Sequence, residues 1–113
     1  MGTFTPFGLI FSGTNSMAQC ILNEILKFLR PINASRLKLN PDLNSAYWSD
    51  IQFLQQKGVP GGSLDNAMEK YFYFHHSNGD TMTVEDSHTL DLCTAVWAVT
   101  SYAIASLDKL LPR

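Results

Sequence analysis

Residues 7 to 31 read FGLIFSGTNSMAQCILNEILKFLRP and combine the patterns of a strand and a helix. This stretch begins with an apolar run at residues 7 to 11, closed by a Ser-Gly turn, which is typical of a short strand. Apolar residues then recur every four positions from about Asn15 to Arg30, the pattern of an amphipathic helix that Pro31 ends. A strand followed directly by a helix predicts an α/β layer structure.

The remainder of the chain continues this alternation of element types. Residues 36 to 39 alternate polar and apolar side chains and predict a short strand, and residues 49 to 57 predict a short helix closed by Gly58. Residues 59 to 64 are predicted to be extended, and the aromatic residues 71 to 75 predict another strand. Since two or three strands make only a small sheet, these patterns predict the end of a larger α/β domain.

A long helix is predicted after Asp86, whose carboxylate can cap its first turn. The uncharged stretch from Leu92 to Leu107 is too short for a comfortable membrane span and contains several hydroxyl residues, so a buried helix explains it better. The predicted inward residues are Leu92, Val96, Val99, Ala103 and Leu110.

Composition limits the class of protein. The chain has 113 residues, a formal charge of −2 and 45% hydrophobic residues, which suits one globular domain or part of one. No basic run is visible, so nucleic acid is not an expected partner. Cys20 and Cys93 lie in predicted helices, so two buried free thiols are favoured over a disulfide. The first residues lack a basic stretch and include Pro6, so no signal peptide is recognised.

Two adjacent histidines, His75 and His76, follow the predicted aromatic strand and precede a small polar turn. By strand alternation they are expected to point to opposite sides. A neutral imidazole is the commonest metal ligand, and Asp80 is near enough in sequence to orient it if the turn folds back. The alternative stays open that both histidines are ordinary edge residues, because a catalytic zinc site usually needs three protein ligands.

Asn33-Ala34-Ser35 is an acceptor sequon for N-glycosylation directly after the helix-ending proline. Asn33 is therefore a candidate glycosylation site if the chain passes through the secretory route. A phosphate-binding loop at Gly61-Gly62 has no support, because the Lys-Ser/Thr pair and the helix of such a loop do not follow. A serine nucleophile at Ser63 has no support either, because the residue lacks a nucleophile elbow.

Residues 58 to 113, which begin GVPGGSLDNAMEKYFYFHHSNGDTMT, resemble the C-terminal end of the zinc-dependent exopeptidases with a two-metal site, and residues 2 to 35 fit the same family. Those enzymes typically carry a histidine ligand in a pattern His-Ser/Thr-x-x-Asp-Thr. The matching residues here are His76, Ser77, Asp80 and Thr81.

A second family pattern, Ser-Asp-His followed by a phenylalanine and Gly-Ile/Val-Pro, is matched incompletely. The matching residues are Ser49, Asp50, Phe53, Gly58, Val59 and Pro60. Ile51 replaces the histidine, which weakens any substrate role for this position and leaves the metal assignment untouched.

The resemblance implies a fold and a set of site residues. The fold is an α/β/α sandwich with a mixed sheet, of which residues 1 to 113 form the C-terminal part of a peptidase catalytic domain. His76 is implied as a ligand in a centre of two zinc ions, and Asp80 as the residue that orients the ring or the turn. The implied wall of the substrate pocket consists of Gly58, Val59, Pro60 and Gly61.

The resemblance also implies a function, namely hydrolysis of dipeptides or short peptides with a free C-terminus by a secreted or lysosomal homodimer. The other metal ligands and the glutamate general base are expected upstream, with the nearest ligand directly before Gly2. We therefore expect no peptidase activity from this chain alone, and we expect the missing N-terminal portion of the same enzyme and a peptide substrate as its partners. Two alternatives are a truncated, non-catalytic paralogue that acts as a binding module, and an aminopeptidase of the same family.

Overall fold

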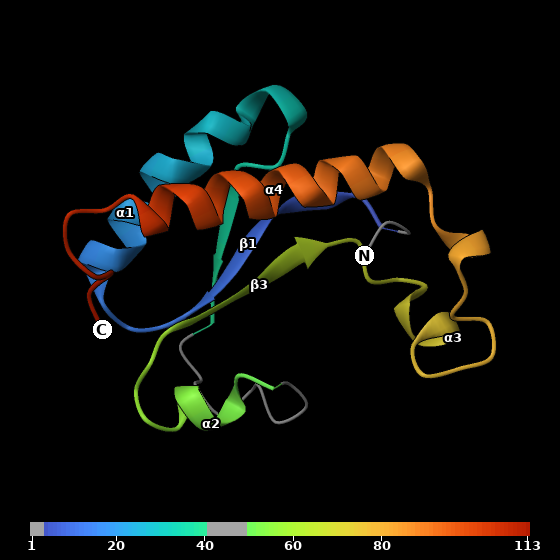
Figure 1. The fold of residues 1–113 in the computed structure, drawn as a ribbon, viewed down its shortest axis with the longest axis horizontal. Helices are drawn as coiled ribbons and strands as arrows, with labels where there is room; N and C mark the ends of the chain where they lie inside the picture. Colours follow the sequence, from blue (N-terminus) through green and yellow to red (C-terminus); the bar gives the residue numbers. More distant parts are fainter. Residues whose placement is uncertain (1–3, 41–49) are drawn as a thin grey trace.

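The computed structural model describes residues 4 to 40 and 50 to 113, and it shows a three-stranded sheet packed against helices (Figure 1). The strand order is β2-β1-β3, with β1 parallel to β2 and antiparallel to β3. The elements are β1 (Pro6–Ser12), α1 (Ser16–Leu26), the 3-10 helix η1 (Lys27–Ile32), β2 (Arg36–Leu39), α2 (Gln52–Gln55), β3 (Gly61–Asn66), α3 (Tyr71–Phe74), the 3-10 helix η2 (Met82–Val84) and α4 (Ser87–Ala105). The predicted α/β class with a mixed sheet is confirmed, and the exopeptidase sandwich stays a prediction.

The core lies between one face of the sheet and the helices α1 and α4. Leu9 and Phe11 are two residues apart on β1 and therefore share a face, and each is only 3% exposed. Leu9 packs in one buried cluster with Leu26 and Val96, and Phe11 packs in a second cluster with Leu22. Burying one such side chain contributes about 1.5–3 kcal/mol, so the two clusters hold both helices on the sheet.

The start of α1 follows the sequence prediction. The side-chain oxygen of Asn15 accepts hydrogen bonds from the backbone amides of Met17 at 2.9 Å and Ala18 at 3.2 Å. These bonds satisfy amides that have no partner inside the helix. The Nδ2 group of Asn15 also donates to the carbonyl oxygen of Arg113 at 2.9 Å, which ties the last residue to the first turn of α1.

The end of α1 differs from the prediction that one helix runs to Arg30. Its α-helical bonding ends at Leu26, and η1 carries the chain through Pro31 in the tighter 3-10 geometry. Proline has no amide hydrogen for the α-helical bond. The turn ends at Asn33, whose backbone φ of 56° is left-handed and whose amide donates to the carbonyl oxygen of Arg30 at 3.0 Å.

The prediction of a strand at residues 71 to 75 is wrong. Residues Tyr71–Phe74 form α3, one turn of helix in which the amide of His75 donates to the carbonyl oxygen of Tyr71 at 3.0 Å. A strand needs a neighbour, and the position beside β1 is occupied by β3, which lies within and just beyond the segment predicted to be extended. The strand preference of aromatic residues reflects packing on a pleated surface, so it has no effect where the chain has no partner strand.

The long helix α4 begins at the predicted cap. A side-chain oxygen of Asp86 accepts a hydrogen bond from the amide of Thr89 at 2.7 Å, and this bonding lowers the pKa of the Asp86 carboxyl. The buried residues of α4 are Cys93, Val96 and Thr100, and Val99 and Ala103 pack against the core as predicted. The inward prediction for Leu110 is wrong, because α4 ends at Ala105 and Leu110 is 90% exposed. None of the helices in the described part of the chain is long and apolar enough to span a membrane.

Neither Cys20 nor Cys93 forms a disulfide among the described residues, as predicted, but the two differ in burial. Cys93 is buried on α4, and its removal from water raises the pKa of the thiol. Cys20 lies on the exposed side of α1, so the prediction that it is buried is wrong.

A close contact at Gly8 joins all three strands. Gly8 pairs with Arg36 of β2 on one side and with Asp65 of β3 on the other. Its φ of 147° is unfavourable for other residues, and a Cβ atom there would lie 1.9 Å from the carbonyl oxygen of Arg36. The Arg36 guanidinium forms an ion pair with the buried carboxylate of Asp65 and lies 4.6 Å from the centre of the Phe7 ring. Only a glycine therefore permits this crossing of the sheet.

Candidate functional site

His76, the predicted metal ligand, lies in the turn that follows α3. Its backbone has a left-handed φ of 54°, and its side chain is exposed. A residue other than glycine rarely adopts this conformation. The rings of His75 and His76 lie with their centres 3.9 Å apart. The prediction that they point to opposite sides is wrong, because it assumed a strand.

The neighbouring histidine is held by the preceding turn of helix. The Tyr71 hydroxyl and Nδ1 of His75 are 2.8 Å apart, and the two rings stack with their centres 4.5 Å apart. Residues four positions apart meet on one face of a helix, so this contact stabilises α3. The imidazole of His76 makes no hydrogen bond among the described residues, which leaves its ring nitrogens open to a ligand.

The turn after His76 is closed by Ser77. Its hydroxyl lies 2.8 Å from the carbonyl oxygen of Phe74 and accepts a hydrogen bond from the amide of Gly79 at 3.1 Å. The backbone amide of Asp80 donates to the carbonyl oxygen of Ser77 at 3.1 Å. The Asp80 side chain is exposed, and within the described residues no hydrogen bond or ion pair joins it to His76. Asp80 therefore takes part in the turn through its backbone.

The family resemblance implies zinc, so the described residues were compared with the ligands that a zinc site needs. In the described part of the chain, no group of three or more histidine, cysteine, aspartate or glutamate residues is placed to hold a metal ion. The exposed His76 imidazole suits one ligand position, because a neutral imidazole nitrogen is a normal zinc ligand. The described residues thus fit one ligand of a zinc site and do not complete a site.

The residues predicted as a pocket wall lie at a different place. Val59, Pro60 and Gly61 line an apolar pocket of about 340 Å³, and Gly58 lines a small hollow beside it. The pocket opens between β3 and α4 and is floored by β1, so we call it the β3–α4 groove. Its lining residues are Leu9, Ile10, Phe11, Leu22, Val59, Pro60, Gly61, Gly62, Trp97, Thr100, Ser101, Ile104, Leu110, Leu111 and Arg113.

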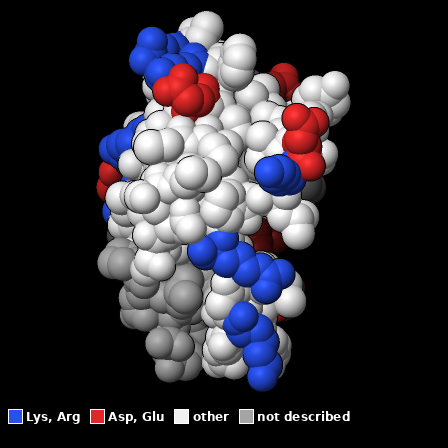
Figure 2. Space-filling view, turned by 90° about the vertical axis from the view of Figure 1, so that its left-hand side faces the viewer, with Lys and Arg blue, Asp and Glu red and all other residues white. Residues whose placement is uncertain are grey.

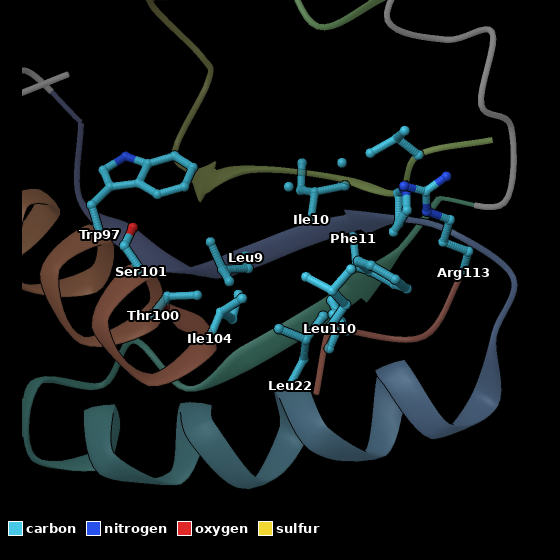
Figure 3. A pocket seen from close by; sticks show the side chains of 15 residues that line it. Leu9, Ile10, Phe11, Leu22, Trp97, Thr100, Ser101, Ile104, Leu110 and Arg113 are labelled. Carbon is cyan, nitrogen blue, oxygen red and sulfur yellow. The ribbon is translucent and has the colours of Figure 1, made fainter. Parts of the chain in front are cut away.

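The groove exists because β3 has a glycine, Gly62, at a position where another residue would project its side chain toward the helices. Gly62 pairs with Phe11, whose side chain faces the helices, and a Cβ atom at Gly62 would meet no atom within 4 Å. Figure 3 shows Leu9 and Phe11 of β1 and Thr100 and Ile104 of α4 around the same space. Thr100 is 3% exposed, and its hydroxyl oxygen is buried without a hydrogen-bond partner.

His76 and the groove lie far apart in the molecule. The chain enters β3 at Gly61, beside the groove, and leaves it at Asn66 before it reaches α3. α3 lies at the opposite end of the long axis of the molecule from the C-terminus, whose last residue lines the groove (Figure 1). The structure therefore does not bring the predicted ligand and the predicted pocket wall together.

The remaining predicted site residues are isolated. Asn33 is exposed at the end of η1, which leaves its amide accessible. Ile51, the substituted position, precedes α2, whereas Ser49 of the same pattern lies outside the described residues. The groove is a feature that sequence reasoning did not find, although the adjacent pair Gly61-Gly62 in an extended segment is a signal for it.

Charge is low around the groove. Figure 2 shows the end of the molecule on which the C-terminus lies, where uncharged side chains cover the middle, charged side chains of both signs lie above and to the right, and basic side chains lie below. Among the described residues, Arg113 is the only charged one that lines the groove. This arrangement suits an uncharged, apolar occupant.

Comparison with known proteins shows similarity over the whole chain to one kind of enzyme. The chain is 45% identical to carboxypeptidase Q of Mus musculus over 112 residues, which is 99% of this chain and 23% of the mouse protein. The identity is 46% over 113 residues with carboxypeptidase Q of Bos taurus and 45% over 113 residues with that of Xenopus laevis, in each case 100% of this chain and 23% of the relative. No protein-family model and no solved structure matches the chain.

The match has a limited extent on the relatives. The chain spans about a quarter of the length of the curated relatives it matches, and the matched part is their C-terminal part. The sequence similarity to an exopeptidase is thus confirmed, and it covers the C-terminal segment of the longer relatives.

Proposed function

Because the chain is related over its whole length to the C-terminal part of carboxypeptidase Q, we propose that it acts as the C-terminal part of a zinc-dependent carboxypeptidase or dipeptidase. The observation that carries the proposal is an identity of 43 to 46% with six carboxypeptidase Q sequences over 99 to 100% of the chain. The proposed substrates are dipeptides or short peptides with a free C-terminus. A secreted or lysosomal location, a homodimer and a glycan at Asn33 belong to the same proposal.

His76 is the proposed metal ligand of this segment. Its ring is exposed and makes no hydrogen bond among the described residues, and the tight turn of Ser77 fixes the chain directly after it. Zinc ions in such a site supply Lewis acidity and lower the pKa of a bound water. This chain contributes one imidazole nitrogen of His76 as a metal ligand. The backbone of Asp80 closes the turn that orients the His76 ring.

The proposal assigns no general base to this chain. The described residues hold no cluster that completes a metal centre. We propose that the remaining ligands and the base lie in an upstream portion of the enzyme, as the family resemblance implies. We therefore propose that the chain alone does not hydrolyse peptides. The proposed pocket wall at residues 58 to 61 serves the same centre only if the segment that carries α3 is repositioned in the complete enzyme, since the two lie at opposite ends here.

The test replaces the matched C-terminal segment of mouse carboxypeptidase Q with this chain. We expect the hybrid to bind zinc and to hydrolyse dipeptides. His76→Ala is expected to lower the zinc content and the activity of the hybrid, and His75→Ala is the matched control, because its ring nitrogen is engaged by Tyr71.

Two results would contradict the proposal. A hybrid in which His76→Ala and His75→Ala both keep full zinc content would remove the assigned ligand. A folded hybrid with full zinc content but no hydrolysis of any dipeptide would support the non-catalytic binding module instead, and cleavage that requires a free N-terminus would support an aminopeptidase.

A further inference from the structure

We propose that the β3–α4 groove is the docking surface for the upstream part of a carboxypeptidase Q-like polypeptide, and that an apolar side chain of that part enters the groove beside Gly62. The inference rests on the proposed function and deepens it, because it names the place at which the missing portion binds. It does not depend on the metal assignment of His76.

The first support is an apolar groove that is open to solvent beside the packed core. Leu9 and Phe11 form the floor of the groove at 3% exposure, and Gly62 leaves room in which a new Cβ atom has no neighbour within 4 Å. The groove has a volume of about 340 Å³ and mostly apolar walls, so it leaves apolar surface in contact with water. A side chain from another segment would remove this surface from water.

The second support is the buried hydroxyl of Thr100. Its oxygen has no hydrogen-bond partner, although nearly all buried polar groups in proteins have one. Thr100 lines the groove, so its hydroxyl lies next to the space that an inserted segment would fill. A purely apolar small molecule would leave this hydroxyl unpaired, so a polypeptide is the better occupant.

The third support comes from the rim. Leu110 is 90% exposed at the edge of the groove, and Trp97 is only partly buried. α4 has no charged residue after Asp91, although a surface helix normally carries charges on its outer side. Such an apolar rim marks an interaction surface.

The identity of the occupant follows from the extent of the match. The chain corresponds to 23% of the mouse relative, so about three quarters of that polypeptide lie outside the matched segment. A domain of this kind buries the apolar faces of its elements against one another. The upstream part is therefore the partner to which the groove is fitted, and a second copy of this chain is the competing occupant.

The experiment co-expresses this chain with mouse carboxypeptidase Q that lacks its matched C-terminal segment, and measures the affinity of the purified parts. Gly62→Leu places a side chain in the groove, and we expect it to weaken binding by about tenfold or more. Ser63→Leu is the matched control, because Ser63 pairs with Ile10 and projects from the opposite face of the same strand. We expect Ser63→Leu to bind like the unaltered chain.

A second measurement separates a blocked groove from a damaged fold. Gly62→Leu fills empty apolar space, so we expect it to raise the melting temperature of the isolated chain while it weakens binding. Thr100→Val removes the unpaired hydroxyl. We expect it to raise the melting temperature of the isolated chain and to weaken binding, both by less than Gly62→Leu does. If the truncated mouse protein is insoluble, the hybrid polypeptide is melted instead, and Gly62→Leu must lower its melting temperature.

Several outcomes would overturn the proposal. Equal binding of the unaltered chain and Gly62→Leu would show that the groove is not used, and equal weakening by Gly62→Leu and Ser63→Leu would place the contact elsewhere. Self-association of the isolated chain that Gly62→Leu abolishes would identify a second copy as the occupant. His76→Ala must leave the affinity unchanged, so a failure of the metal proposal is distinguished from a failure of docking.

Discussion

The sheet with α1 and α4 and the segment of residues 67 to 85 are held in different ways. In the first region, Leu26 and Val96 are fully buried and pack around the central strand. In the second, α3 and η2 contain no buried residue, and Phe72 and Tyr73 are 82% and 75% exposed. The first region is stabilised by the chain's own core, whereas the second, which carries the proposed metal ligand, buries little of its apolar surface.

The proposed metal-binding segment therefore buries little apolar surface of its own, and we expect contacts with another polypeptide to stabilise it. Aromatic side chains that stay in water contribute nothing to folding through burial. The exposed rings of Phe72 and Tyr73 are therefore available to pack against another polypeptide.

The largest effect is expected at the centre of the sheet. Gly8→Val is expected to prevent folding, because its Cβ atom would collide with the carbonyl oxygen of Arg36 and its φ of 147° is unfavourable for a branched residue. Circular dichroism and urea unfolding measure the loss. Gly62→Ala is the matched control, since the new methyl group meets open space, and a Gly8→Val chain that is as stable as this control would contradict the packing of β1 against β2.

A pair of truncations compares the two regions directly. Leu26→Ala removes a fully buried side chain and is expected to lower the free energy of unfolding by about 2–5 kcal/mol. Phe72→Ala truncates an exposed ring in α3 and is expected to change it by less than about 0.5 kcal/mol. Urea unfolding monitored by circular dichroism gives both values. Equal losses would show that the α3 segment shares the core.

A smaller effect is expected at the cap of α1. Asn15→Ala removes the acceptor for the amides of Met17 and Ala18 and is expected to lower the free energy of unfolding by about 0.5–2 kcal/mol. Asn15→Asp retains the acceptor for the helix but loses the donor to Arg113, so it measures the two roles of this side chain separately. If Asn15→Ala has no effect, the cap does not contribute to the stability of the first region.

The smallest effect is expected at the cap of α4 and depends on pH. Hydrogen bonding to the backbone of Thr89 lowers the pKa of Asp86 in the folded chain, so the unfolded chain takes up the proton more readily. The stabilisation is present above the unfolded pKa of about 4 and is lost as the pH falls through the lower folded pKa. Unfolding of the unaltered chain and of Asp86→Asn at pH 6 and at pH 3 measures it. The difference between the two proteins should shrink at pH 3, and a difference that grows would contradict the assignment.

The elements that could be predicted from the sequence are those whose apolar residues recur at a regular spacing and pack in the core. The strand at residues 7 to 11, the helix from about Asn15, the short strand from Arg36 and the helix capped by Asp86 all follow from local patterns. The segment from Tyr71 failed for a physical reason. Its aromatic residues favour a strand only beside a partner strand, and whether one is available depends on distant parts of the chain.

The candidate site was harder to predict than the fold. The resemblance singled out His76, but the local pattern assumed an extended backbone, whereas the structure shows a left-handed turn. The groove arises from the absence of a side chain at Gly62 opposite α4, which depends on strand register and on the path of a helix that begins 25 residues later. Local periodicity contains no information about such a space.

The bond between Asn15 and the carbonyl oxygen of Arg113 has a practical consequence for handling the protein. An affinity tag fused after Arg113 would emerge beside the first turn of α1 and crowd the mouth of the groove. Trimming the last residues would remove Leu111 from its contact with the second buried cluster and leave the Nδ2 group of Asn15 without its acceptor. Immobilisation for binding assays is therefore better made through the exposed thiol of Cys20 than through the tail.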